Sequence, residues 1–211
     1  MTEPWYYQEA ETPSQFPWPP PENGPVLAAF GDTWRSATFE PTSLFARIPH
    51  EGGSGPAVLY YLILGILLAG ANLFWETLTG GRETGLAPGA EFQPVMFFLL
   101  SPILLLLGLV ISAAVIHVML LLVRGATHSF GTSLRVLCYA YSPMIFGVIP
   151  LLGTVVGGVW MLVITVLGLA AAHETERWKA ALAVLLPFLL ALGLLMVAIM
   201  MLIAAGALIL P

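Results

Sequence analysis

Residues 136–172 form a long stretch without Asp, Glu, Lys or Arg, and this stretch constrains the fold more than any other feature. A membrane-spanning helix needs about 20 predominantly apolar residues, so the stretch is about twice as long as one span. Pro150 and Gly153 divide it, because proline interrupts a helix and glycine permits a turn. We therefore predict two membrane-spanning helices, over residues 134–149 and 151–172, joined by a tight apolar turn.

Three further apolar runs are long enough to cross a membrane: residues 57–75, 95–123 and 180–210. Pro102 and Pro187 lie inside the two longer runs and are expected to kink them. Of the 211 residues, 58% are hydrophobic and 9% are charged, whereas a soluble domain has about 25% charged residues. The chain is therefore predicted to be an all-α polytopic membrane protein, with five transmembrane helices in residues 56–211.

The basic residues predict the orientation of these helices, because cytoplasmic loops carry an excess of Lys and Arg. With the N-terminus inside the cell, Arg82 is the one basic residue on the outer side. The others fall on the cytoplasmic side: Arg35, Arg47, Arg124, Arg135, Arg177 and Lys179. We therefore predict an N-inside, C-outside topology.

The remaining charge pattern excludes several classes of function. The net charge of −5 arises within residues 1–56, and no basic patch of the kind that binds nucleic acid is present. The interiors of the predicted spans carry no charged side chain, which argues against an ion-coupled transporter because intramembrane charges mark ion paths. Cys138 is the only cysteine, so an intramolecular disulfide is excluded.

The N-terminal region divides into two parts. Residues 1–24 are rich in proline and acidic residues and are predicted to form a disordered cytoplasmic tail, although their aromatic residues would also suit docking on a partner. Residues 25–55 read as an amphipathic segment lying in the headgroup plane. Phe30, Trp34 and Phe45 are its expected interfacial anchors. The alternative is that this segment packs on the protein's own cytoplasmic loops.

Polar residues near the predicted cytoplasmic face form a first candidate site. Its members are His117, Arg124, Arg135 and His173. Several histidines and the nearby Glu174 offer metal-ligating atoms, but the sequence HETER departs from the H-E-x-x-H zinc motif. We therefore predict no metal and no cofactor. An enzyme using His117, His128 and His173 remains a further hypothesis, while the expectation is a protein without catalytic residues.

A second candidate site surrounds Pro143 in the predicted third span. Proline leaves the carbonyl one turn earlier, near Tyr139, without its helical hydrogen bond, and a carbonyl inside a membrane needs another donor. We predict a notch for a partner or ligand, and a purely structural kink is the alternative. The notch residues are Tyr139, Tyr141, Ser142, Pro143 and Trp160.

Small residues predict how the two halves of the uncharged stretch pack. Gly153 and Gly157 have the spacing that lets helix backbones approach closely, and the preceding span is the expected partner. The indole N–H of Trp160 needs an acceptor, so we expect this side chain inside the bundle.

Several motifs in fixed order resemble the bacterial branch of the Yip1-domain family. They are residues 121–125 after His117, residues 135–143 (RVLCYAYSP), Ile149-Pro150, Gly153, Trp160, Gly168-Leu169 and His173. The resemblance covers residues 40–205. The pattern departs at residues 168–172, where the family leads us to expect a charged or polar residue before the histidine.

The resemblance implies five helices, a cytosolic N-terminal region and a role in organising membranes or partner proteins. Eukaryotic relatives are similar to trafficking adaptors that associate with Rab GTPases at Golgi and endoplasmic reticulum membranes. The Ala-, Gly- and Leu-rich spans favour the cell membrane of a prokaryote, with the Golgi or endoplasmic reticulum as the alternative. The expected partners are the lipid bilayer, membrane or cytosolic proteins and a second copy of the chain. A small-solute or lipid transporter or channel is the alternative function.

Overall fold

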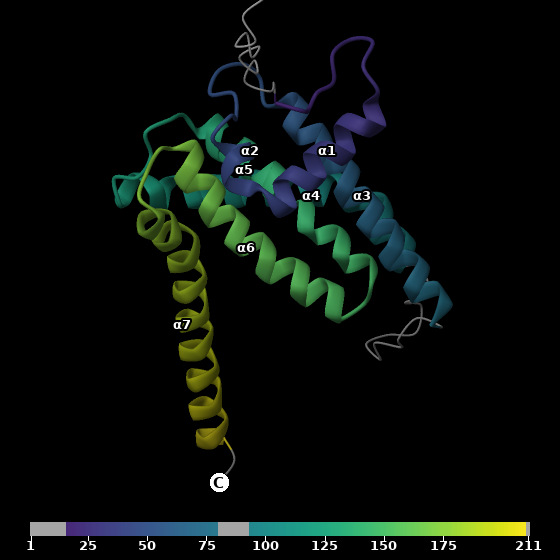
Figure 1. Ribbon diagram of the computed structural model, residues 1–211. Coiled ribbons are helices and arrows are strands. Elements are labelled where there is room, and N and C mark those ends of the chain that lie inside the picture. Colours follow the sequence, from purple (N-terminus) through teal and green to yellow (C-terminus); the bar gives the residue numbers. More distant parts are fainter. Residues whose placement is uncertain (1–15, 80–92, 210–211) are drawn as a thin grey trace, which may run out of the picture.

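The computed structural model describes residues 16–79 and 93–209, and these form helices and connecting segments without a strand (Figure 1). The elements in chain order are α1 (Val26–Phe39), α2 (Pro41–Phe45), α3 (Gly55–Leu78), α4 (Gln93–Leu122), α5 (Phe130–Ala140), the 3-10 helix η2 (Ser142–Val148), α6 (Leu152–Ala172) and α7 (Arg177–Ile209). The all-α prediction is therefore confirmed for the described residues.

Four of these helices contain segments that are long and apolar enough to cross a membrane: Gly55–Leu78, Pro94–Leu122, Leu152–Ala172 and Arg177–Met201. The chain is therefore a multi-pass integral membrane protein. Pro102 and Pro187 lie inside α4 and α7, as their positions in the apolar runs predicted.

The prediction of five transmembrane helices is supported for only four of them, because the expected helix over residues 134–149 is broken. The α-helical part α5 ends at Ala140, and the chain continues as the 3-10 helix η2. Pro143 explains the break, since it has no N–H to donate to the carbonyl of Tyr139 and its ring clashes with an α-helical turn. The tighter 3-10 geometry continues the chain past this point.

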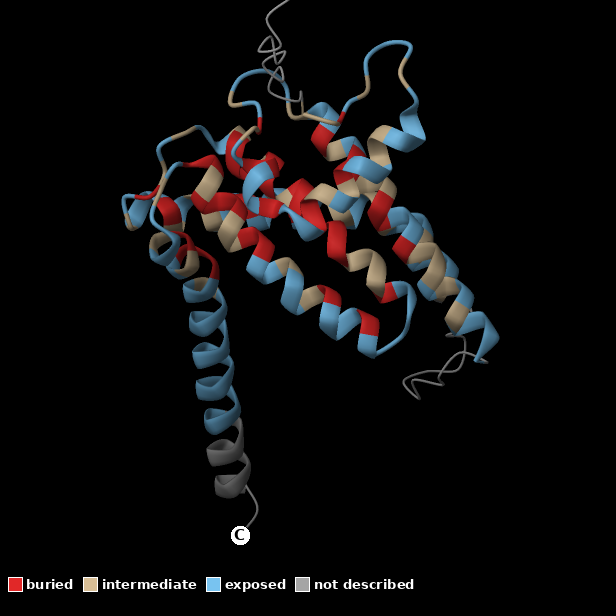
Figure 2. Ribbon diagram, viewed as in Figure 1, coloured by how far each residue is buried: buried red, intermediate tan, exposed pale blue. Residues whose placement is uncertain are grey.

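The aromatic residues of the N-terminal segment face the protein, which corrects their assignment as interfacial anchors. Phe45 is completely buried, and Trp34 is half-buried. Phe30 packs edge-on against Trp18 and lies 4.9 Å, between ring centroids, from Tyr60 of α3. The alternative, in which this segment packs on the protein itself, therefore describes α1 and α2 correctly. Figure 2 shows buried residues concentrated where they meet the other helices.

The predicted disordered tail, residues 1–24, extends too far along the chain. Residues 1–15 lie outside the described part. Trp18 is only 5% exposed, and its indole N–H donates to the carbonyl of Pro56, 2.8 Å away, at the start of α3. Phe16 packs on Tyr139 with 4.8 Å between ring centroids. The ordered structure therefore begins before α1.

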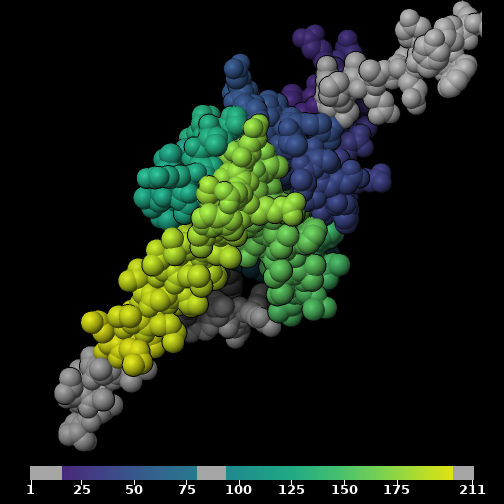
Figure 3. Space-filling model, turned by 60° about the vertical axis from the view of Figure 1, so that its left-hand side comes forward, coloured from purple at the N-terminus to yellow at the C-terminus, as the bar shows by residue number. Residues whose placement is uncertain are grey.

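Helix α7 contrasts with this packed region. Among its residues up to Met201, the buried ones are Ala180, Ala183 and Val184, all in the first turns. Beyond these turns it projects from the body of the molecule, and most of its apolar side chains are exposed (Figures 1 and 3). In a membrane protein such a surface suits lipid contact, because the hydrocarbon chains of lipid replace water as the solvent for apolar side chains.

The predicted close approach of α6 to the preceding element is confirmed. A Cβ atom on Gly153 would lie 1.8 Å from the carbonyl oxygen of Phe146 in η2, and one on Gly157 would lie 2.7 Å from that of Pro143. Only glycine leaves room for backbones this close. The neighbouring Gly158 faces open space.

Candidate functional site

The break between α5 and η2 is held by a group of hydrogen bonds that we call the kink junction, formed by Trp34, Tyr60, Tyr139 and Ser142. The hydroxyl of Ser142 donates to the carbonyl of Tyr139 at 2.7 Å. The phenol of Tyr60 lies 2.7 Å from the same hydroxyl. Since the serine proton is already used, Tyr60 is the donor in that pair. The indole of Trp34 donates to the carbonyl of Ser142 at 3.0 Å.

The kink junction therefore satisfies the carbonyl that Pro143 deprives of its helical partner, as the sequence predicted. Tyr139 and Tyr141 face different neighbours: Tyr139 packs on Tyr60 and Tyr141 packs on Tyr61. Ser142 and Pro143 are buried. The predicted notch is thus filled by side chains of α1 and α3.

Trp160 lies apart from the other predicted notch residues. Its indole N–H finds an acceptor, the carbonyl of Thr38 at 2.7 Å, but this acceptor belongs to α1. The ring is 37% exposed, so the expectation of a position inside the bundle is wrong. Trp160 instead fastens the N-terminal segment to the outer face of α6.

All four histidines of the chain meet at the other end of α5, in a group that we call the histidine junction: His50, His117, His128 and His173. His50 lies in the segment after α2, His117 in α4, His128 between α4 and α5, and His173 at the end of α6. The rings of His50 and His128 are stacked, with centroids 3.9 Å apart. His173 lies 5.9 Å from His128 and 6.0 Å from His117 by the same measure.

A directed chain of hydrogen bonds assigns the protons within this junction. The backbone N–H of His128 donates to Nδ1 of His173 at 3.2 Å, so the imidazole proton of His173 lies on Nε2. This Nε2 donates to the hydroxyl of Ser133 at 2.9 Å, which leaves the serine proton for Nδ1 of His117, also at 2.9 Å. His173 is therefore neutral. Burial, together with weaker electrostatic repulsion from the three other histidines, lowers its pKa to about 4.

The two stacked histidines keep a nitrogen lone pair available. Thr127 donates its hydroxyl proton to the carbonyl of His173, so it accepts from Nδ1–H of His128, 2.9 Å away. In the neutral ring, the free lone pair of His128 then lies on the other nitrogen, Nε2. Nδ1 of His50 is buried and has no hydrogen-bond partner among the described residues. Burial lowers the pKa of His50, His128 and Arg135 lower it further, and Glu174 opposes them.

Glu174 completes a group of metal-ligating side chains at this junction. One ligand atom each from His50, His128 and Glu174 can be chosen so that all lie within 4.8 Å of one another. Glu174 is exposed and has a φ of 49°, in the left-handed region that favours glycine. It ends α6 in a Schellman motif, in which the N–H of Thr175 donates to the carbonyl of Ala170.

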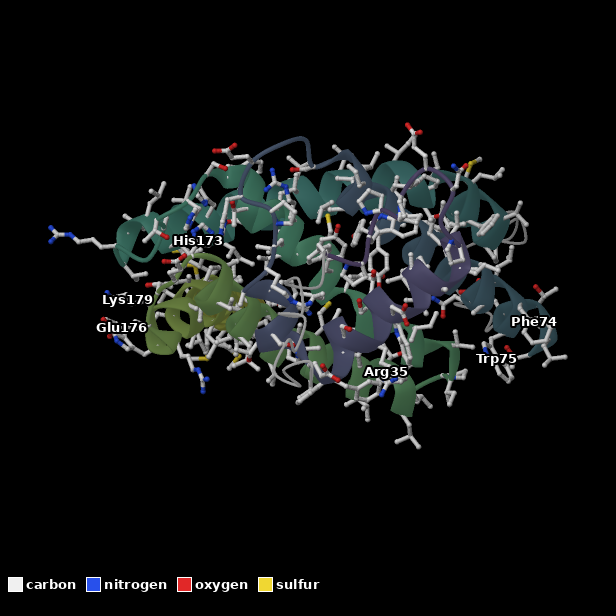
Figure 4. All side chains as sticks on the ribbon, turned by 45° about the horizontal axis from the view of Figure 1, so that its top comes forward. Arg35, Phe74, Trp75, His173, Glu176 and Lys179 are labelled. Atoms are coloured by element: carbon white, nitrogen blue, oxygen red, sulfur yellow. The ribbon has the colours of Figure 1, made fainter. Side chains whose placement is uncertain are left out.

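Arg135 and Arg124, the basic residues of the predicted polar cluster, have different positions. Arg135 is 5% exposed, and its guanidinium donates to the carbonyls of Pro49 and, at 2.5 Å, Gly52. It therefore holds the segment that carries His50. Arg124 is exposed at the end of α4 with a φ of 54°. Figure 4 shows His173 near Glu176 and Lys179, at the opposite end of the molecule from Phe74 and Trp75.

The sequence predicted His117, Arg135 and His173 as parts of one polar cluster, and the structure brings these three to the same junction. The sequence did not predict His50, whose ring stacks on His128, or Ser133, whose hydroxyl links His173 to His117. No local signal marks either residue, because their partners are distant along the chain. The pair Ser133 and His173 is separated by 40 residues and the pair Ser133 and His117 by 16.

Comparison with known proteins supports the resemblance seen in the sequence. The family model for the Yip1 domain matches residues 35–200, which include every helix from α2 to α6. No curated protein and no solved structure matches the chain significantly.

Proposed function

Because this chain belongs to the Yip1 domain family, we propose that it is a non-enzymatic membrane protein that organises partner proteins at one face of the bilayer. The observation that carries this proposal is the ordered N-terminal segment. Indole N–H groups fasten it to the transmembrane helices at three places, through Trp18, Trp34 and Trp160. A segment held in this way presents a preformed surface, which lowers the entropy lost when a partner binds.

The surface of α1 that points away from the bundle has the composition of a docking face. Leu27 is 88% exposed and Phe39 is 61% exposed, and both lie on the same short helix as the exposed Asp32 and Arg35. Figure 4 shows Arg35 projecting from α1. Aromatic residues and arginine are enriched at protein–protein interfaces relative to the rest of the surface.

We further propose that the broken helix makes a fifth crossing. The 11 residues of α5 and 7 of η2 have a combined length of about 30 Å, close to the thickness of the hydrocarbon core. Trp75, near the end of α3, donates to the carbonyl of Val148 at the end of η2, 2.7 Å away. The end of α3 and the end of η2 therefore lie at the same depth along the bundle.

The five-crossing arrangement agrees with the N-inside orientation in a prokaryotic cell membrane. The described basic residues lie in the N-terminal segment or near the connections α4–α5 and α6–α7, all of which a five-crossing chain puts on one side. Labelling of cysteines introduced one at a time at Thr127 and Ile149, in a Cys138→Ala background, tests this. The proposal requires opposite accessibility in sealed vesicles, and labelling of both from the same side would contradict it.

A photo-crosslinking amino acid at position 27 tests the docking face in native membranes. We expect a discrete protein adduct that the second-site variant Phe39→Glu reduces at least several-fold. The same probe at Val156, an exposed residue of α6, is the matched control and should give no such adduct. Lipid adducts alone at both positions would overturn the proposal. Deletion of residues 25–49 would be a less specific test, because it also removes the core residues Leu44, Phe45 and Ile48 and so disturbs the fold.

A lipid transporter remains the second candidate because of one observation. A recess of about 270 Å³ lies between α1, α3 and η2, and its lining residues are Phe30, Gly31, Trp34, Leu64 and Ile145. Such an apolar lining suits an acyl chain. Transfer of fluorescent lipid between the leaflets of reconstituted vesicles, lost in Ile145→Trp, would favour this candidate.

A further inference from the structure

We propose that His50, His128 and Glu174 form a binding site for a divalent transition-metal ion of the zinc type. The three residues come from three different connecting segments: the segment after α2, the α4–α5 connection and the α6–α7 connection. A bound ion would therefore link all three segments at one end of the bundle. This site is independent of the docking face on α1.

The donor set suits zinc. Two imidazole nitrogens and one carboxylate oxygen occur together in zinc sites that keep a fourth position for water. Hard ions such as Mg²⁺ and Ca²⁺ prefer sites made wholly of oxygen, so they are weaker candidates here. The exposed position of Glu174 leaves an entry path for the ion.

Each histidine offers a nitrogen that hydrogen bonds have not already used. Thr127 fixes the proton of His128 on Nδ1, so Nε2 can bind the ion. Nδ1 of His50 is buried without a partner among the described residues, which is unfavourable in the absence of a ligand. A metal bond to that nitrogen removes the unsatisfied group.

The surroundings of the three ligands resemble the supporting contacts of a metal site. Metal-binding histidines usually donate their second N–H to an oxygen, as His128 does to Thr127, and such contacts fix the orientation of the ring. Thr127 is itself held by the carbonyl of His173, and Arg135 holds the segment around His50. The ring of His128 and the backbone on either side of His50 are thus held by buried parts of the bundle.

The backbone at Glu174 supports the same conclusion. A helix that ends in a Schellman motif usually has glycine at the position with positive φ. Glutamate in the left-handed region costs about 1–2 kcal/mol relative to an ordinary conformation. Arg124 ends α4 in the same conformation, so the feature that distinguishes Glu174 is its metal-ligating side chain. The carboxylate of Glu174 is the group that glycine would not supply.

Binding requires a local rearrangement. Ligand atoms around a tetrahedral zinc ion lie roughly 3.3 Å apart, as follows from bond lengths of about 2.0 Å, whereas the three atoms here lie within 4.8 Å of one another. The rings of His50 and His128 are nearly parallel, with 17° between their planes, and one ion cannot lie in both planes. His50 stands outside any helix, so its ring is the one expected to turn toward the ion.

The test uses the full-length protein in detergent, with any purification tag removed. Zn²⁺ is titrated against a chromophoric chelator, and Co²⁺ is added separately to record its absorption bands. We expect one high-affinity Zn²⁺ per chain, tetrahedral Co²⁺ bands, and at least a tenfold loss of affinity in His128→Ala and Glu174→Gln. Glu176→Gln and Glu51→Gln are matched controls, because these exposed carboxylates lie close in sequence to Glu174 and His50, and both should bind as the unchanged protein does.

Size-exclusion chromatography establishes that each variant is folded before its affinity is compared. His50→Ala gives a second reading, because His50 lies on a connecting segment and its loss leaves the helices intact. The proposal is overturned if the unchanged protein binds no Zn²⁺ at micromolar concentrations. It is equally overturned if the folded His128→Ala, Glu174→Gln and His50→Ala variants all bind Zn²⁺ with unchanged affinity.

Discussion

The kink junction and the histidine junction lie at the two ends of α5, and they use polar groups for different purposes. At the kink junction, Ser142 and Tyr60 satisfy a carbonyl that proline leaves without a partner. At the histidine junction, Ser133 links His173 to His117, while Thr127 orients His128, so that His50 and His128 keep lone pairs available. The kink junction thus satisfies the hydrogen bonding of the backbone, whereas the histidine junction positions side chains that can bind a ligand.

This difference shows how a largely apolar chain can carry two kinds of polar group: some that stabilise the fold, and others that can change charge or bind a ligand. Hydroxyl, phenol and indole groups do not change their charge near neutral pH, so they are suited to permanent contacts in an apolar setting. Imidazole changes its charge near neutral pH and also binds metals. The comparison therefore predicts that substitutions at the kink junction affect stability most, and that those at the histidine junction affect binding most.

The largest effect is expected where η2, which carries the kink junction, meets α6. Gly153→Ala places a Cβ atom against the carbonyl of Phe146, so backbones must separate. We expect a loss of about 3 kcal/mol or more in the free energy of unfolding, at the upper end for overpacked interiors. Thermal unfolding in detergent measures it. Gly158→Ala, which meets no neighbouring atom, should be nearly neutral; equal effects would contradict the packing described.

A smaller loss is expected when the central hydroxyl of the kink junction is removed. Ser142→Ala leaves the carbonyl of Tyr139 and the phenol of Tyr60 without their hydrogen-bond partner, at a cost of about 2 kcal/mol. A double-mutant cycle with Tyr60→Phe measures the coupling between the two residues. Strictly additive effects would show that Tyr60 and Ser142 do not interact.

At the histidine junction, removal of the hydroxyl of Ser133 is expected to cost about 1–2 kcal/mol, because it leaves Nε2–H of His173 unpaired. The adjacent Thr132 is the matched control. Its hydroxyl is buried without a partner among the described residues, so Thr132→Val should be neutral or slightly stabilising. Measured under the same conditions, the unfolding temperature should therefore fall when the Ser133 hydroxyl is removed and should not fall in Thr132→Val. A larger loss for Thr132→Val would contradict the hydrogen-bond assignment.

The smallest expected change is a gain in stability. Glu174→Gly removes the strain of a positive φ and should raise the free energy of unfolding by up to about 1 kcal/mol. The same substitution should weaken Zn²⁺ binding. Arg124→Gly is the matched control at the equivalent position of α4, and it should give a similar gain while leaving Zn²⁺ affinity unchanged. A loss of stability in Glu174→Gly would mean that the carboxylate supports the fold.

Local signals in the sequence predicted a kink at Pro143 and the need for a second donor to the freed carbonyl, although not that the α-helix ends there. Pro143 predicted an unsatisfied carbonyl at Tyr139, and the glycine spacing predicted the close contact of Gly153 with the preceding element. The same reasoning failed for Phe45. An amphipathic pattern shows that one face of a segment avoids water, but it does not distinguish lipid from the protein's own helices as the surface that covers it.

The apolar composition and the length of the uncharged runs, such as residues 136–172, determined that this protein is embedded in a membrane, since runs this long are stable in lipid and not in water. Proline and glycine determined where its helices break and approach, because these effects arise from the covalent structure of single residues. Only the tertiary structure decided that His50, His117, His128 and His173 meet. Their proximity depends on how four separate segments pack, and no pattern along the chain records distances between segments that touch only after folding.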